Sequence, residues 1–175
     1  MHKKFLKKYY FIDKFNKSNI DKQSVNTTII YRNYNVNYKL EDILFMRDYC
    51  KKRNLKFLIS NNIKLSIQLN LDGAYLPSFN KNYNHLNYDF KKNFLLIGSA
   101  HNLKEIKVKE KQNVKEIFLS SIFKENKNYL GLNKFNNISK LTSKRIIALG
   151  GISENNIKLL KFTKSIGLAG ISFFS

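Results

Sequence analysis

Two consecutive glycines, Gly150 and Gly151, follow the short apolar run 146–149 and stand just before Ser153. An unbroken apolar run of this length is typical of a parallel strand that is buried on both faces. Glycines permit φ > 0 and let backbone N–H groups approach a ligand closely, and Ser153 predicts the N-cap of a helix that begins at Glu154. Because a helix N-terminus attracts anions, this stretch predicts a phosphate site. An ordinary strand-to-helix turn without a ligand is the alternative.

The segment after these glycines completes a larger unit. Residues 157–166 have one broad apolar side at helical spacing, and residues 167–175 form a second apolar run that predicts a strand. Strand, glycines, helix and strand in this order make a βαβ unit, whose two strands are parallel.

The rest of the chain repeats this alternation. Residues 13–23 predict a loop or a short helix, and residues 78–93 carry no clear pattern. The fold class is α/β, and eight strands with a phosphate-type turn near the end favour a compact TIM (β/α)8 barrel that lacks its final helix. A doubly wound open sheet is the alternative, since it shares the βα repeat. Strands are predicted over 8–12, 27–32, 55–59, 72–77, 94–98, 115–120, 146–149 and 167–175, and further helices over 40–53, 62–70, 103–112 and 136–141.

The stretches Ala148-Leu-Gly-Gly-Ile152 and Gly167-Leu-Ala-Gly-Ile171, together with Asn155, resemble the last two strand segments of the thiamine phosphate synthase/TenI family. The resemblance spans nearly the whole chain and implies one domain, 1–175, folded as a TIM barrel that holds a thiazole phosphate at these loops. Loops after strands seven and eight are also the frequent phosphate site of such barrels. The substrate-binding and phosphate-binding residues expected from the resemblance and the glycine turn are Arg32, Ser120, Lys134, Gly150, Gly151 and Ser175.

The same resemblance implies a magnesium and diphosphate site at the ends of the second to fourth strands, but several of its residues are replaced. Arg32 matches the family's arginine in this region, whereas Ile30 stands where a glutamine belongs. Magnesium prefers anionic oxygen ligands, so two amides make a weak site and we expect no bound metal; magnesium enters as a cofactor only through the resemblance. Without it, a diphosphate leaving group loses its main charge neutraliser. The degenerate positions are Tyr34 for a lysine, Ser60 for an asparagine, and Asn61 and Asn80 for two magnesium-binding aspartates.

Two catalytic candidates stand after the fifth and sixth strands. Gly98-Ser-Ala-His-Asn102 resembles the family's Gly-Val-Ser-x-His, and His101 could act as an acid or base because histidine titrates near neutral pH. The alternative is that His101 orients a loop. Residues 117–123 resemble the family's loop after the sixth strand, where the tautomerase branch has a catalytic histidine and this chain has Ser121. Ser121 or the adjacent Ser120 can donate a hydrogen bond to a bound ring or phosphate.

Two classes of function remain open. The first is an enzyme of thiamine biosynthesis, either a divergent thiamine phosphate synthase or a tautomerase-like relative that acts on the thiazole. The second is a non-catalytic relative that binds thiazole phosphate or thiamine phosphate at the rim of the barrel. The fold does not decide between them, since function depends on the site.

The composition is strongly basic, with a formal net charge of +20 over 175 residues. The lysines are spread along the chain, which is also rich in asparagine and isoleucine, so we expect no nucleic-acid partner. A basic RNA-binding protein is the distant alternative, without a recognisable motif to support it. The positive field would help to attract phosphorylated ligands.

Compartment and assembly are predicted from a few residues. The single cysteine, Cys50, excludes an internal disulfide and favours a reducing cytoplasm, and no apolar stretch is long enough for a membrane span. Because the final helix of the barrel is missing, Phe173 and Phe174 would need another cover. An N-terminal segment or a second subunit could supply this cover, and from the second possibility we expect a homodimer.

Overall fold

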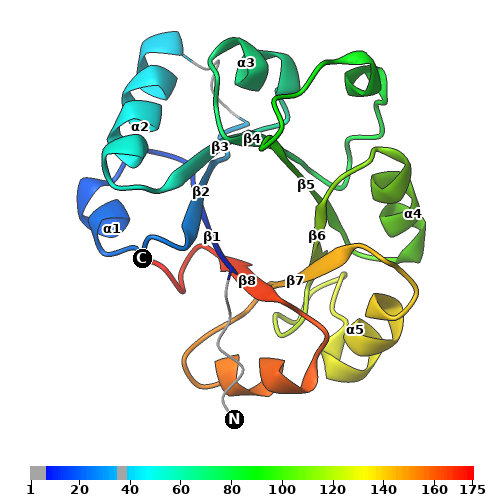
Figure 1. Ribbon diagram of the computed structural model, residues 1–175. Coiled ribbons are helices and arrows are strands. Elements are labelled where there is room, and N and C mark those ends of the chain that lie inside the picture. The colour runs from blue at the N-terminus through cyan, green and yellow to red at the C-terminus, as the bar shows by residue number, and fades with distance from the viewer. Residues whose placement is uncertain (1–6, 35–38) are drawn as a thin grey trace.

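The computed structural model describes residues 7–34 and 39–175. Eight parallel strands close into a barrel in the order of the chain, from β1 next to β2 through to β8, which pairs again with β1 (Figure 1). The predicted TIM-like barrel is confirmed, and the open sheet is excluded because both edges of the sheet are paired. The strands are β1 Lys7–Ile12, β2 Thr27–Tyr31, β3 Lys56–Ser60, β4 Gly73–Leu76, β5 Leu95–Ala100, β6 Glu116–Ser120, β7 Arg145–Leu149 and β8 Gly167–Gly170.

Helical segments surround the barrel as an outer ring (Figure 1). Two of the connections carry only a short 3-10 helix, namely the one after β4 and the one after β7. The α-helices are α1 Lys17–Asp21, α2 Leu40–Lys52, α3 Ile63–Gln68, α4 Leu103–Lys111 and α5 Gly131–Ser139, and the 3-10 helices are η1 Asn84–Asn87 and η2 Ile157–Phe162.

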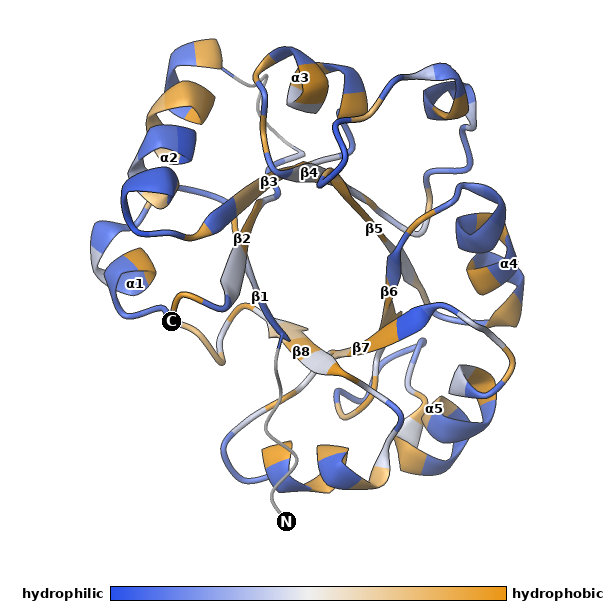
Figure 2. Ribbon diagram, in the orientation of Figure 1, coloured by the Kyte–Doolittle hydropathy of each residue, from blue (hydrophilic) through white to orange (hydrophobic). Residues whose placement is uncertain are grey.

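Side chains along each strand alternate between the inside of the barrel and the surrounding helices. Figure 2 shows hydrophobic residues along the strands, whereas the helices carry both kinds of residue. The outward-facing side chains form one core with the helices, to which α2 contributes Ile43, Met46 and Cys50. The inside of the barrel is a second core, formed by Tyr9, Phe11, Ile30, Leu58, Tyr75, Leu95, Ile97, Phe118, Ile147 and Ala169.

A buried carboxylate closes the base of the barrel, where the strands begin. Glu116 is 0% exposed, and it accepts hydrogen bonds from the Lys7 ammonium and the Tyr9 hydroxyl. The Arg145 guanidinium lies 3.3 Å from the same carboxylate. Burial and the adjacent Glu116 charge raise the pKa of Tyr9, so this hydroxyl remains a donor. The network joins β1, β6 and β7 at their first residues.

The helix predicted from Glu154 is wrong. Residues 154–156 form a turn that leads into η2, and Ser153 does not cap a helix with its side chain. The Asn156 side chain explains this, because it accepts from the Ser153 N–H at 2.9 Å and donates to the Gly151 carbonyl at 2.8 Å. Asparagine side chains that bond to nearby backbone in this way favour turns over helices.

Other elements also differ from the predictions. The last strand ends at Gly170 instead of continuing to residue 175, and α5 spans Gly131–Ser139 instead of 136–141. The unassigned segment 78–93 contains η1. No helix within 7–34 or 39–175 has the length and apolar character that a membrane span requires.

The described part of the chain has no helix after β8, as predicted, and its last residues turn back toward α1 (Figure 1). Phe174 is 7% exposed because it packs against Tyr10, with 5.5 Å between the ring centres. The Gln23 side chain donates to the Phe174 carbonyl at 2.9 Å. The chain's own N-terminal segment therefore covers Phe174, which is the first of the two covers that the sequence predicted.

Candidate functional site

All eight strands are parallel, so the residues that follow them meet at one rim of the barrel. Arg32, Asn61, His101, Ser121 and Gly150 each stand directly after the end of a different strand. The prediction that these five residues share one rim is confirmed.

Aromatic rings fill the barrel just below this rim. Phe11, Tyr75 and Phe118 lie with their ring centres 5.2–5.6 Å from one another. The Arg32 guanidinium lies over the Phe11 ring, 4.7 Å from its centre, which is a cation–π contact. Burial raises the pKa of Tyr75 to about 12, against the opposing effect of its 2.8 Å hydrogen bond to Ser99. A ligand at the rim would therefore rest on a packed floor of aromatic rings, with the Arg32 cation over one of them.

The rim after β2, β3 and β4 carries neutral groups that bond to one another. The Tyr34 hydroxyl lies 2.9 Å from the Ser60 hydroxyl, and the Asn80 side chain donates to the side-chain amide oxygen of Asn61 at 2.7 Å. Asn61 and Asn80 also line a pocket of about 190 Å³.

These residues do not fit magnesium. Two neutral amides that already satisfy each other offer no carboxylate oxygen, and hard divalent cations require anionic oxygens. Within the described ranges, no group of three or more His, Cys, Asp or Glu residues is placed to hold a metal ion.

His101 is paired with an acidic residue that sequence reasoning missed. Its Nδ1 lies 2.9 Å from the Glu105 carboxylate, which also accepts from the His101 backbone N–H at 2.8 Å. Asn102 caps α4 by accepting from the Glu105 N–H at 3.0 Å, so the start of the helix fixes the carboxylate. Nδ1 is thereby occupied, and Nε2 is the nitrogen left to face a ligand. The spacing Asn-x-x-Glu, typical of a capping box, was the available signal.

The two glycines after β7 have the predicted positive φ, +103° at Gly150 and +73° at Gly151. They pack against the loop after β6. A Cβ at Gly150 would lie 2.4 Å from the Ser121 Oγ, and one at Gly151 would lie 2.5 Å from the Lys124 nitrogen. The Gly150 carbonyl also accepts from the Phe123 N–H at 2.9 Å. The loop after β6 therefore packs closely against the glycines, at the place where a ligand was predicted. The residues that follow the glycines do not begin an α-helix.

The other predicted binding residues are spread around this end of the barrel. Ser120 ends β6 and is 7% exposed; it follows Phe118 at a spacing of two and therefore shares its inward direction. Lys134 lies exposed in α5. Ser175 donates to the Ile171 carbonyl at 3.1 Å, in the turn beside α1. The structure thus brings Ser121 and the glycines together but does not bring Ser175 to them.

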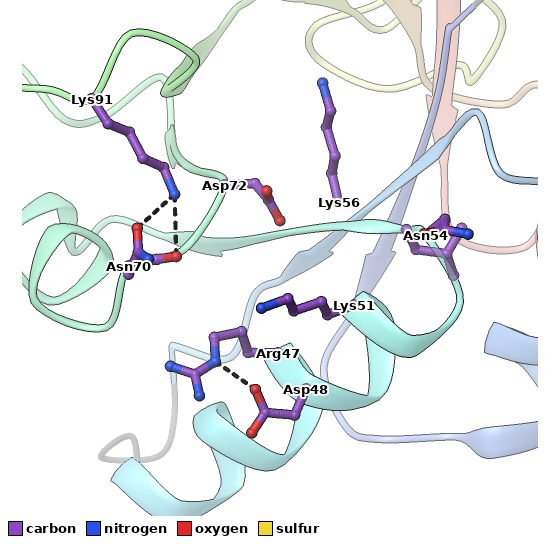
Figure 3. A pocket seen from close by; sticks show the side chains of 9 residues that line it. Arg47, Asp48, Lys51, Asn54, Lys56, Asn70, Asp72 and Lys91 are labelled. Carbon is purple, nitrogen blue, oxygen red and sulfur yellow. Dashed lines mark hydrogen bonds and ion pairs between the residues drawn. The ribbon is translucent and has the colours of Figure 1, made fainter.

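A basic pocket of about 590 Å³ lies at the base of the barrel, where β3 and β4 begin (Figure 3). None of the predicted site residues lines it. Two of its cations serve the end of α3, since Arg47 donates to the Leu69 carbonyl at 3.0 Å and Lys91 to the Asn70 carbonyl at 3.2 Å. Cations at a helix C-terminus stabilise the helix, so this pocket has a structural explanation.

Comparison with known proteins assigns the chain to a family. Residues 21–175 match the family described as thiamine monophosphate synthase. The chain belongs to this family. This confirms the resemblance that was based on the glycine turn and the strand-end segments.

Individual relatives of the chain carry the same description. A putative thiamine-phosphate synthase 2 of Aquifex aeolicus is 31% identical over 139 residues, which are 74% of this chain and 71% of that protein. The thiamine-phosphate synthase of Coprothermobacter proteolyticus is 26% identical over 133 residues, 74% of this chain but 63% of that protein. The thiamine phosphate pyrophosphorylase from Pyrococcus furiosus superposes with a TM-score of 0.74 at 18% identity, covering 97% of this chain and 87% of that chain. At this identity the superposition shows the shared fold.

Proposed function

We propose that the protein binds thiazole phosphate or thiamine phosphate at the rim of the barrel and that its synthase turnover is weak or absent. The observation that carries this proposal is the hydrogen-bonded pair of Asn61 and Asn80, which stands where the family resemblance implies two magnesium-binding aspartates. Synthesis from a pyrimidine diphosphate requires the charge of the leaving group to be neutralised. Two amides supply no such neutralisation, because they hold no metal firmly.

The rim still offers groups for a single phosphate. Arg32, which follows β2, faces the barrel interior, where its guanidinium can bind a phosphate. The Ser120 hydroxyl can donate to a phosphate oxygen, whereas the Ser121 hydroxyl donates to the Lys124 carbonyl at 2.9 Å. Lys134 and the net charge of +20 add long-range attraction for anions.

Calorimetric titration tests the proposal. Thiazole phosphate and thiamine phosphate should each bind, and magnesium should leave their affinities unchanged. Pyrimidine diphosphate with magnesium should then give little or no thiamine phosphate. Turnover at a rate typical of enzymes, about 1 per second or faster, would overturn the argument from the amide pair.

A second candidate function is a thiazole tautomerase-like activity, and the contact between His101 and Glu105 favours it. The carboxylate holds the imidazole ring and its tautomer, and the free Nε2 can then accept a proton from a bound ring and return it. This activity needs no metal. It is measured as interconversion of thiazole phosphate tautomers, in parallel with the titrations.

Assembly and compartment stay proposals. The homodimer has less support than the sequence suggested, because Phe174 is covered within the chain, although Ile171 beyond β8 is 52% exposed. Light scattering at micromolar concentration tests it.

The buried free thiol of Cys50, whose pKa burial raises to about 12, is consistent with a reducing cytoplasm. RNA binding would be recognised by a steep fall of affinity with salt.

A further inference from the structure

Lys109 of α4 is a buried lysine that the proposed function does not use. Its side chain is 0% exposed, whereas lysines are almost never fully buried without a partner. Its ammonium group donates to the Pro77 carbonyl at 2.7 Å, the Asn80 carbonyl at 2.8 Å and the Gln112 amide oxygen at 2.9 Å. An ammonium group has three donors, so all of them are used, and all three acceptors are neutral.

The barrel makes room for this side chain at a glycine of β5. A Cβ at Gly98 would lie 2.7 Å from Lys109 Cδ and 3.1 Å from Cγ. Any larger residue at position 98 would meet the stem of the lysine, so the close packing of the strand against this side chain depends on glycine. Lys109 is therefore a buried part of the packing between α4 and β5.

The partner of Lys109 in this arrangement is Gln112, which is also 0% exposed. Its amide nitrogen donates to the Asn82 carbonyl at 2.8 Å and to the Asn80 carbonyl at 3.1 Å. Its backbone carbonyl lies 2.8 Å from the ring nitrogen Nε2 of His85. Together the two side chains bind the backbone of three residues in the segment that follows β4, and the Gln112 backbone binds a fourth residue, His85.

That segment has little regular secondary structure. Residues 77–94 contain only the short helix η1, whereas the connections after β2, β3, β5 and β6 carry α-helices. Helices are held mainly by an apolar face, but an irregular segment must satisfy its backbone groups individually. Here the Lys109 ammonium group and the Gln112 amide satisfy backbone carbonyl groups of this segment.

The same segment delivers two side chains to the rim. Asn80 reaches Asn61 with its amide, and the Phe79 ring packs edge-on against Tyr34 with 5.6 Å between ring centres. The backbone oxygen of Asn80 is bound by Lys109, so a shift of the lysine moves the residue that forms the amide pair.

We propose that Lys109 is a positioning residue for the candidate site: it binds the carbonyl oxygens of Pro77 and Asn80 as an internal cation and thereby sets where Asn80 and Phe79 stand at the rim. The consequence for ligand affinity rests on the proposed function. The consequence for the loop does not.

The primary test compares Lys109→Met with Lys111→Met. Methionine keeps an unbranched apolar stem over Gly98 but has no donors, and Lys111 is an exposed lysine of the same helix. In Lys109→Met, amide hydrogen exchange in residues 78–88 should be at least tenfold faster, with exchange in β5 unchanged, and the Kd for thiamine phosphate should rise about tenfold. Lys111→Met should match the unmodified protein in both measurements. Unchanged exchange in residues 78–88 of Lys109→Met would overturn the proposal.

Chemical rescue covers the case in which Lys109→Met fails to fold. Lys109→Ala lacks the group that n-propylammonium supplies, so millimolar n-propylammonium should restore protection of residues 78–88, whereas n-propanol should not. Equal effects of the two additives would overturn the proposal, because the cation would then have no special role. If the unmodified protein binds neither phosphate ligand, the proposed function fails, but the exchange data still decide the role of Lys109.

Discussion

The two halves of the rim use their polar groups differently. After β2, β3 and β4, the side chains of Tyr34 and Ser60, and those of Asn61 and Asn80, are neutral and bond to one another. After β5, the His101 ring lies against a carboxylate, with 2.9 Å between its Nδ1 and Glu105. In the first half these four neutral side chains satisfy one another without a ligand, whereas in the second half a carboxylate fixes an imidazole ring. Separate βα units carry the two halves, so each can change without rebuilding the other.

The largest expected effect concerns the glycine turn of the second half. Gly151→Val introduces a Cβ where the Lys124 backbone lies 2.5 Å away and forces valine to φ near +73°. We expect a loss of about 3 kcal/mol in the free energy of unfolding, seen as a melting temperature lower by roughly 6–12 °C. Binding of thiamine phosphate to the folded fraction should fall at least about tenfold.

Gly170→Ala is the matched control for this variant. Gly170 has no positive φ, and the nearest atom to an added Cβ is 3.6 Å away, so its melting temperature should change little. Equal melting temperatures for the two variants would mean that the turn does not constrain the loop after β6.

Proton transfer gives the next effect. His101→Asn should lower turnover of thiazole phosphate tautomerisation about 100-fold, since a positioned acid or base contributes roughly this much. Ser60→Ala, in the self-satisfied half, should change the same turnover less than about twofold. If both variants behave alike, the second half of the rim is not where the chemistry occurs.

A charge restored to the first half should have a smaller effect. In the variant Asn61→Asp with Asn80→Asp, two carboxylates replace amides that are 2.7 Å apart, and their repulsion should lower stability by about 1 kcal/mol. Magnesium should restore that stability and bind at least about tenfold more tightly than to the unmodified protein. Asn62→Asp adds a charge at the N-cap of α3 and should gain no magnesium affinity. Thermal melting with and without magnesium measures both effects.

The smallest effect follows from the titration of Lys109. Burial lowers its pKa from 10.5 to about 8, which Glu105 on the same helix partly opposes. The unfolded chain thus binds a proton that the folded chain has released between these pH values, so stability should rise with pH, by about 1 kcal/mol between pH 8 and 9. On the segment that packs against Lys109, the titratable side chain of His85 contacts the backbone carbonyl of Gln112. The free energy of unfolding of Lys109→Met, measured with urea over the same pH range, should not show this rise. An identical rise in both proteins would mean that another group causes it.

The barrel was predictable because its signals are local and repeated. Apolar runs such as 146–149 and 55–59 separate helical patterns, and the strand ends follow directly from them, which placed Asn61 and His101 correctly. The end of the chain was less predictable. Asn156 replaces the expected cap with side-chain bonds to the backbone of Gly151 and Ser153, a choice that residue types alone do not reveal.

Contacts distant in sequence account for what was missed at the site. The glycines after β7 were read as open to a ligand, because nothing in the sequence shows that the loop at Lys124 packs onto them. The role of Lys109 was likewise hidden, since a lysine in a lysine-rich helix is normally exposed. Only the fold brings it beneath the segment that carries Asn80.

The pairing at the base of the barrel bears on how the chain can fold during synthesis. β1 is the first described strand, yet one of its neighbours is β8, and its Tyr9 bonds to Glu116, 107 residues later. A chain emerging from the ribosome therefore holds an unpaired hydrophobic edge on β1 until β8 has been made. Contacts of such long sequence separation also slow folding. Closure of the barrel thus waits for the pairing of β1 with β8, and a chain truncated before Gly167 should collect as an open, aggregation-prone sheet.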